Sequence, residues 1–220
     1  MKNKIYLLLI ISALFITCSK DSDTNPNENA ETYKLLKRVT YTDFYSGQMN
    51  LDFAYANGLL ISVTDGDEPY YFEYNSNNKI TGFDETLNFD NKGNLISDIF
   101  PEGADSLYYT YDNNGNVSSM YVTDGNGGYT ITYLFDGKKN PFNVLWEKYG
   151  YYDWGGQGFE PYQMVGCIFK QNATKVFKDN ELELEANYTY DADGYPISCG
   201  FTEYLSGGET RSGTVTYTYN

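Results

Sequence analysis

The 220-residue sequence has no histidine, only three cysteines and half as many basic as acidic residues. Without histidine it lacks the usual general base, the usual activator of a serine or cysteine nucleophile and a common zinc ligand. Fifteen Lys and Arg against 30 Asp and Glu give a formal net charge of −15, which opposes binding to a phosphate backbone. We therefore expect no nucleic-acid partner, no cofactor, no bound metal and none of the familiar histidine-dependent enzyme chemistry.

Long apolar runs are also missing, apart from one near the start of the sequence. Lys2 and Lys4 precede residues 5–16, which are apolar except for Ser12. A helix of about a dozen residues rises roughly 18 Å, which is too short for a hydrocarbon core of about 30 Å. Basic residues before a short apolar run are typical of a secretory signal peptide, which we assign to residues 1–17.

The apolar run ends at a cysteine that is a candidate for lipid attachment. Residues 15–18, FITC, resemble a loose bacterial lipobox that departs from the usual pattern at Phe15 and Thr17. The following SKDSD looks like the acidic export tag of Bacteroidetes surface lipoproteins. The resemblance implies that Cys18 is lipidated and anchors the protein in a membrane, because more than one acyl chain gives a stable anchor. The alternative is an ordinary signal peptide with an incidental cysteine.

Residues 18–32 are predicted to be the lipidated cysteine and a flexible acidic tether. They contain Asp, Asn, Ser and Glu with almost no apolar side chains, so burial cannot offset the entropy of ordering. We predict that residues 33–220 form the folded domain.

This domain is rich in aromatic residues. The chain has 24 Tyr and 13 Phe, and after residue 17 aromatic residues outnumber Leu, Ile and Val together. Such residues favour pleated surfaces, and no sustained 3.6-residue apolar period follows residue 32. We predict an all-β domain: a single antiparallel meander of roughly 10–14 strands, strongly curled, with closure into a barrel as one outcome because closure removes exposed edges. A membrane-spanning barrel is less favoured, because the expected outer positions carry Thr, Asn, Asp and Glu.

A recurring unit of strand, Asp/Asn-rich turn and strand organises the domain. Clear copies lie at residues 89–95, 111–117 and 190–197, and looser ones at 55–59, 74–80 and 135–139. Asp at the first turn position accepts a backbone N–H, and glycine three residues later takes the positive φ that closes the turn. These glycines are Gly93, Gly115 and Gly194, and replacing any of them by valine should strain its turn.

The unit resembles the YD repeat of the RHS and teneurin proteins, whose core is Tyr-Asp-x-x-Gly. The copies that begin at Tyr111 and Tyr190 match this core, and the copy at Phe89 matches with Phe in place of Tyr. With the lipobox and the tether, residues 33–220 look like a group of uncharacterised Bacteroidetes surface lipoproteins described as having a porin-like fold. The resemblance implies that fold and a surface-exposed location at the outer membrane. The irregular spacing of the copies argues against the cargo-enclosing role of the large RHS proteins.

Residues 145–162 interrupt the hairpin pattern and combine aromatic rings with four glycines. Rings on a loop stack against sugars, and neighbouring polar groups bond the sugar hydroxyls. The candidate ligand-binding residues are Trp146, Tyr149, Tyr151, Tyr152, Trp154, Phe159 and Tyr162. The alternative is that the segment plugs or caps the sheet and that its rings are core, because Trp is highly buried on average.

Carboxylates and cysteines leave further alternatives open. Glu147, Asp153 and Glu160 would be the first candidates in a glycoside hydrolase, although no pair of carboxylates stands out. Acidic clusters in the turns fit turn formation better than a calcium loop. Cys167 and Cys199 lie in strand-like contexts, and the sequence leaves open whether they form a disulfide or stay two buried thiols.

These patterns predict an outer-membrane lipoprotein that acts as a non-catalytic binding module, with glycans as the expected ligands of residues 145–162. The alternative is a structural or protein-interaction scaffold that has a surface protein as partner and no small-molecule site. An enzyme acting on polysaccharide is the least favoured of the three.

Overall fold

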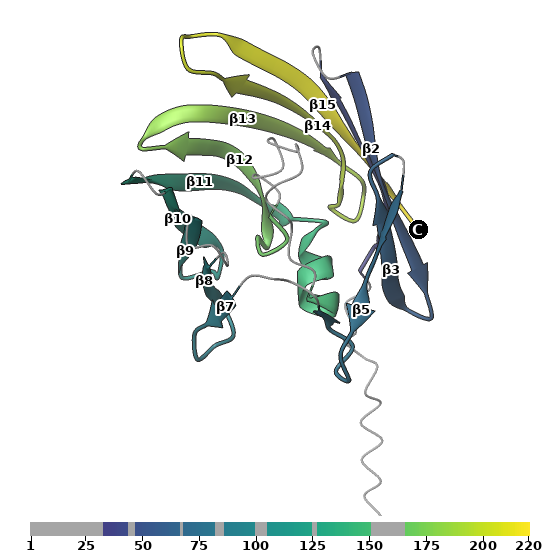
Figure 1. The fold of residues 1–220 in the computed structure, drawn as a ribbon. Coiled ribbons are helices and arrows are strands. Elements are labelled where there is room, and N and C mark those ends of the chain that lie inside the picture. The colour runs from purple at the N-terminus through teal and green to yellow at the C-terminus, as the bar shows by residue number, and fades with distance from the viewer. Residues whose placement is uncertain are drawn as a thin grey trace, which may run out of the picture. The chain divides into compact units, whose positions relative to one another are not determined.

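The domain is built from antiparallel β-hairpins (Figure 1). The computed structural model describes residues 33–43, 47–66, 68–81, 86–99, 105–124, 127–150 and 166–220. Their strands are β1 (Leu36–Asp43), β2 (Gly47–Ala56), β3 (Leu59–Thr64), β4 (Pro69–Tyr71), β5 (Glu73–Tyr74), β6 (Ile80–Thr81), β7 (Thr86–Phe89), β8 (Leu95–Ile99), β9 (Asp105–Tyr111), β10 (Val117–Asp124), β11 (Gly127–Lys139), β12 (Gln171–Lys178), β13 (Glu181–Tyr190), β14 (Pro196–Tyr204) and β15 (Thr210–Tyr219). A short helical turn, η1 (Leu145–Tyr149), lies between β11 and β12.

Thirteen of these strands form one antiparallel sheet. Its order is β4-β3-β2-β1-β15-β14-β13-β12-β11-β10-β9-β8-β7, while β5 and β6 form a separate pair. From β1 to β4 and from β7 to β15, each strand pairs with the next one in the chain. β1 also pairs with β15, where Val39 stands opposite Tyr217. The predicted all-β antiparallel meander is therefore confirmed.

The sheet is open and not strongly curled, so the expected strong curling is wrong and closure into a barrel is not the outcome. Its two edges are β4 and β7, and within the described residues no ladder joins them. The chain between these edges forms the separate β5–β6 hairpin, in which Tyr74 stands opposite Ile80, instead of extending either edge. The main sheet therefore keeps both of its edges.

The hairpin turns at the recurring units share one hydrogen-bond pattern. After β7, the Asp90 N–H donates to Asn94 O at 2.9 Å and the Gly93 N–H donates to Asp90 O at 3.1 Å. The Asp90 carboxylate Oδ1 also accepts the backbone N–H groups of Lys92 at 2.8 Å and Asn94 at 2.9 Å. These bonds to the charged form hold the pKa of Asp90 below its usual value, led by the bonds from Asn94.

The same bonds recur in the turns headed by Asp112 and Asp191. The glycine of each turn is left-handed: φ is 85° at Gly93, 81° at Gly115 and 82° at Gly194. Only glycine adopts this conformation without a steric cost, so the position in the turn explains the residue type.

Two segments depart from the predicted pattern of recurring hairpin turns. Residues 135–139 form no hairpin turn but an irregularity inside β11, where the register with β12 shifts. Gly137 there has φ 77°, and Asp136 Oδ1 accepts the Lys138 N–H at 2.8 Å. Conversely, the turn between β14 and β15 has the shared bonds without an acidic residue, because Leu205 takes the place of Asp.

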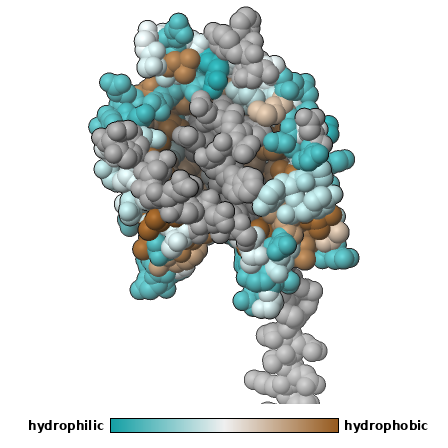
Figure 2. Space-filling model, viewed as in Figure 1, coloured by the Kyte–Doolittle hydropathy of each residue, from teal (hydrophilic) through white to brown (hydrophobic). Residues whose placement is uncertain are grey.

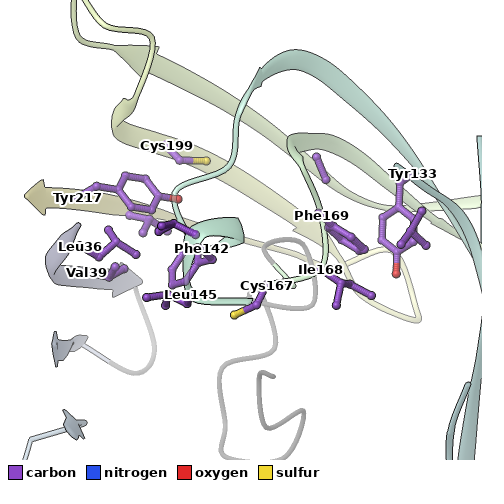
Figure 3. Close-up of a cluster of buried hydrophobic side chains, with 14 of the residues drawn as sticks. Leu36, Val39, Tyr133, Phe142, Leu145, Cys167, Ile168, Phe169, Cys199 and Tyr217 are labelled. Atoms are coloured by element: carbon purple, nitrogen blue, oxygen red, sulfur yellow. The ribbon is translucent and has the colours of Figure 1, made fainter. Parts of the chain in front are cut away.

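The core lies on one face of the sheet, under the chain that connects β11 to β12. From this connection, the ring of Phe142 lies 6.3 Å from Phe53 and 6.4 Å from Tyr217, centroid to centroid. Figure 3 shows the same contact with Tyr217 and places Phe169 beside Tyr133, whose ring centroid is 4.8 Å away. Branched aliphatic side chains share this space with the rings, because the buried core residues also include Leu36, Val39 and Leu145.

In the view of Figure 2, hydrophilic side chains cover much of the described upper surface, while hydrophobic ones gather in separate clusters. Among the described residues, no helix reaches the length and apolar character that crossing a membrane would need.

Candidate functional site

Two asparagines, the buried Asn140 and the half-buried Asn143, hold together the two flanks of the aromatic segment. Asn140 Nδ2 donates to Phe169 O at 2.9 Å, and Asn143 Nδ2 donates to Cys167 O at 3.1 Å. These bonds join residues 140–143 to residues 167–169 beside the core.

The described part of the segment is the π-helical turn η1, which ends at Gly150 with φ 69°. Lys79, from the β5–β6 hairpin, donates from Nζ to the carbonyl oxygens of Glu147 at 2.6 Å and Lys148 at 3.2 Å. A cation on these terminal carbonyls satisfies acceptors that have no partner within the helical turn.

Tyr149, one of the predicted ligand-binding residues, lies in the core and has no surface to offer a ligand. The residue is fully buried, and its hydroxyl donates to Gly58 O in the β2–β3 turn at 3.1 Å. Its ring centroid is 6.2 Å from that of Tyr55. For this residue the plug interpretation of the aromatic segment applies, because the helical turn directs Tyr149 and Leu145 toward the sheet.

Trp146 lies on another side of η1 and meets the opposite edge of the sheet. Its ring stacks on Phe89 of β7, with centroids 6.1 Å apart and planes 19° apart. Trp146 is partly buried against the core, whereas Phe89 is 48% exposed. Through Tyr149 and Trp146, η1 thus contacts the β2–β3 turn and the edge strand β7.

Polar groups lie beside this stack. The Tyr33 hydroxyl donates to Glu147 Oε2 at 3.2 Å, and both residues are exposed. Phe89 and Tyr33 were absent from the sequence-based candidates. Phe89 did stand out as the first aromatic residue of a repeat, but no local signal pairs it with Trp146.

The remaining predicted site residues lie outside the described residues. They are Cys18, Tyr151, Tyr152, Trp154, Phe159 and Tyr162, together with the carboxylates Asp153 and Glu160. The predicted signal peptide at 1–17 and tether at 18–32 lie outside them as well.

The acidic turns carry local bonds and an ion pair. Lys34 Nζ lies 2.6 Å from both Asp191 Oδ2 and Asp193 Oδ2. The hydrogen bond from Lys34 is the main reason that the pKa of Asp191 is lowered. Across the ranges that the structure describes, no three Cys, Asp or Glu side chains come together in a group that would hold a metal ion.

Cys167 and Cys199 are two buried thiols that no disulfide joins. Figure 3 shows them on separate segments, Cys167 beside Ile168 and Cys199 on β14. Burial raises the pKa of the Cys199 thiol to about 12, so it is protonated and unreactive at neutral pH.

A half-buried group of polar side chains is centred on Asp136, at the irregularity in β11. The Tyr190 hydroxyl donates to Asp136 Oδ2. The fully buried Asn172 donates from Nδ2 to Lys139 O at 3.0 Å and to the Tyr190 hydroxyl at 3.3 Å. Burial raises the pKa of Asp136 despite its hydrogen bonds, and it raises the pKa of the nearby Tyr188 as well.

Replacing Asp136 by Asn is expected to change how stability depends on pH. Because its folded-state pKa is raised, Asp136 keeps a proton that the unfolded chain releases at lower pH, so wild-type stability falls as pH rises through this window. The Asp136→Asn variant lacks the titrating carboxyl group, and so it lacks this decrease in stability. Urea unfolding from about pH 3.5 to about pH 7 should therefore show the variant gaining stability relative to wild type as pH rises. A difference that is constant or decreases with pH would contradict the raised pKa.

A solved structure shares this all-β antiparallel fold. The crystal structure of a porin-like protein from Bacteroides uniformis matches with a TM-score of 0.54 and 12% identity, covering 84% of this chain and 98% of that chain. A porin-like protein from Bacteroides vulgatus matches with a TM-score of 0.45 and 11% identity, covering 85% and 99%. The match to the Bacteroides uniformis protein shows only that the two chains share a porin-like fold. No family model and no curated protein matches the sequence.

Proposed function

We propose that the protein is a non-catalytic binding module that takes glycans through residues 145–162. The observation that carries this proposal is the near-parallel stack of Trp146 on Phe89, next to a segment whose flanks are fixed to the core. Sugar C–H faces pack on aromatic rings, and the carboxylate of Glu147 and the hydroxyl of Tyr33 supply hydrogen-bonding groups beside the stack.

The proposal places the module at the outer membrane. The basic and apolar residues 1–17 support a signal peptide, and Cys18 with its acidic tether supports a lipid anchor that leaves the domain at the cell surface. The porin-like fold is in keeping with an outer-membrane association.

The scaffold alternative also has a specific observation in its favour. Tyr149 and Leu145 are fully buried, so part of the aromatic segment serves the core. In this alternative the whole segment covers the sheet, and the protein meets another surface protein rather than a sugar.

A glycan array with the purified protein separates the two functions. Trp146→Ala should weaken binding by about tenfold, because losing one stacked ring costs about 1.4 kcal/mol. Phe89→Ala should weaken it less, since Phe89 supports the ring of Trp146 from one side. Tyr71→Ala is the matched control: it removes a 68% exposed ring from the other edge strand and should bind as wild type does.

Two outcomes would contradict the proposal. If folded Trp146→Ala and wild type bind equally, the site does not lie at this stack. If folded wild type binds no glycan on the array, the scaffold function is favoured instead.

A further inference from the structure

We infer a second glycan-binding surface, on the face of the sheet opposite the core, centred on Tyr108 of β9 and Tyr121 of β10. The two residues stand directly opposite each other in the β9–β10 ladder, with ring centroids 6.5 Å apart and planes 37° apart. Each is 44% exposed. Their chain neighbours Tyr109 and Val122 are buried in the core, so the two exposed rings belong to the outer face.

Gly128 on β11 determines how Tyr121 lies. A Cβ atom at Gly128 would lie 2.3 Å from the Tyr121 hydroxyl oxygen and 2.6 Å from its Cζ. The ring therefore extends across β11 through the space that a larger residue would fill. A ring that lies along the sheet presents its face to solvent, which is the orientation that a sugar ring stacks on.

The residues around the two rings carry hydrogen-bonding groups without charge. In the same row of the sheet, Thr130 stands opposite Tyr121. Ser97 stands opposite Tyr108, but it is buried and its hydroxyl accepts a hydrogen bond from Asn88 Nδ2 at 3.0 Å. In the next row, Thr110 stands opposite Ser119, and their hydroxyl oxygens are 2.7 Å apart. One residue in five of the chain is charged, so an uncharged area around exposed rings is distinctive.

An acidic side chain does lie at the margin of this area. Asp179, in the β12–β13 turn, accepts the Thr130 backbone N–H at 2.9 Å from its Oδ1. Its carboxylate is thereby directed at the backbone of β11, and it adds negative rather than positive charge to the margin.

This chemistry fits an uncharged polysaccharide chain. Two neighbouring rings fit successive sugars of one chain, and the surrounding hydroxyls replace the water that bonds the sugar hydroxyls. The net charge of −15 opposes acidic glycans. A protein partner would need a larger interface with an apolar centre, whereas serine and threonine hydroxyls surround these rings.

Affinity electrophoresis tests the inference, with dextran, mannan, xylan and laminarin as neutral probes and polygalacturonate as the acidic comparison. Tyr108→Ala and Tyr121→Ala should each weaken binding to a neutral polymer by about fivefold to tenfold, and 0.5 M NaCl should leave wild-type binding unchanged. Leu134→Ala is the control: it removes a 52% exposed aliphatic side chain from β11 and should not affect stacking. Thermal melts show that each variant is folded.

The outcomes separate this surface from the site at Trp146. If the tyrosine variants lose binding while Trp146→Ala keeps it, the outer surface stands and the loop site falls. If Trp146→Ala loses binding while folded tyrosine variants bind as wild type, this inference is overturned and the proposed function stands. If the tyrosine variants and Trp146→Ala all lose binding, both sites are supported. The outer surface is overturned if none of the neutral polymers retards the folded wild-type protein. It is also overturned if Leu134→Ala weakens binding as much as the tyrosine variants do.

Discussion

Gly213→Val is expected to lower the free energy of unfolding by about 3 kcal/mol, because the new side chain has no space. Gly213 lies in β15 opposite Phe201, and a Cβ there would be 2.4 Å from Phe201 Cζ and 2.5 Å from Thr42 O. Phe201 is buried and stacks on Tyr41, with ring centroids 5.4 Å apart and planes 16° apart. Any side chain at Gly213 must therefore displace a core ring, a backbone carbonyl or both.

Gly200→Val is the matched control for this prediction. Gly200 lies in the adjacent strand β14, opposite Thr214, and no atom lies within 4 Å of the Cβ that the substitution adds. Valine favours strands, so we expect little change or a small gain in stability. Urea unfolding of both variants gives the comparison. Equal stability of the two variants would mean that Phe201 does not occupy the space beside Gly213.

Tyr149→Ala is the second change with a large expected effect, a loss of about 3–5 kcal/mol in the free energy of unfolding. Tyr149 is fully buried, contacts the ring of Tyr55 and bonds Gly58 O, so truncation leaves a cavity between η1 and the β2–β3 turn. The loss tests whether η1 is a structural part of the core as well as the start of the proposed binding segment.

Tyr149→Phe divides the effect into its parts. It keeps the ring and removes only the hydroxyl that donates to Gly58 O, so the expected loss is about 1 kcal/mol. Guanidinium unfolding of both variants gives the two losses. A loss in Tyr149→Ala that is no larger than the loss in Tyr149→Phe would contradict the packing of η1 on the sheet.

The sequence predicts those parts of the fold that depend on local chemistry. The Asp and Gly of each recurring unit act within five residues of each other, as the bonds of Asp112 and the left-handed Gly115 show. The antiparallel meander follows from such turns, because each one returns the chain beside the strand that it has just left. The turn at Leu205 was missed because its backbone bonds need no acidic side chain.

Features that depend on distant contacts were not predictable in the same way. Trp146 and Tyr149 belong to one aromatic run, yet one stacks on an exposed phenylalanine and the other is buried. Their difference depends on which side of η1 faces the sheet, and a five-residue π-helical turn has no periodic pattern long enough to show it. The open edges depend likewise on where the chain leaves the main sheet after β4.

The pairing of β1 with β15 also has a consequence for the order of assembly. β1 is an interior strand, but its second neighbour is β15, at the other end of the domain in sequence, so the middle of the sheet is completed only after residues 210–219 have emerged. Until then the growing chain carries an unsatisfied row of backbone groups through what will become its centre. A ladder between strands so distant in the sequence forms slowly, because a long loop must close first, and this lengthens the exposure of unpaired strands to proteases and to other chains.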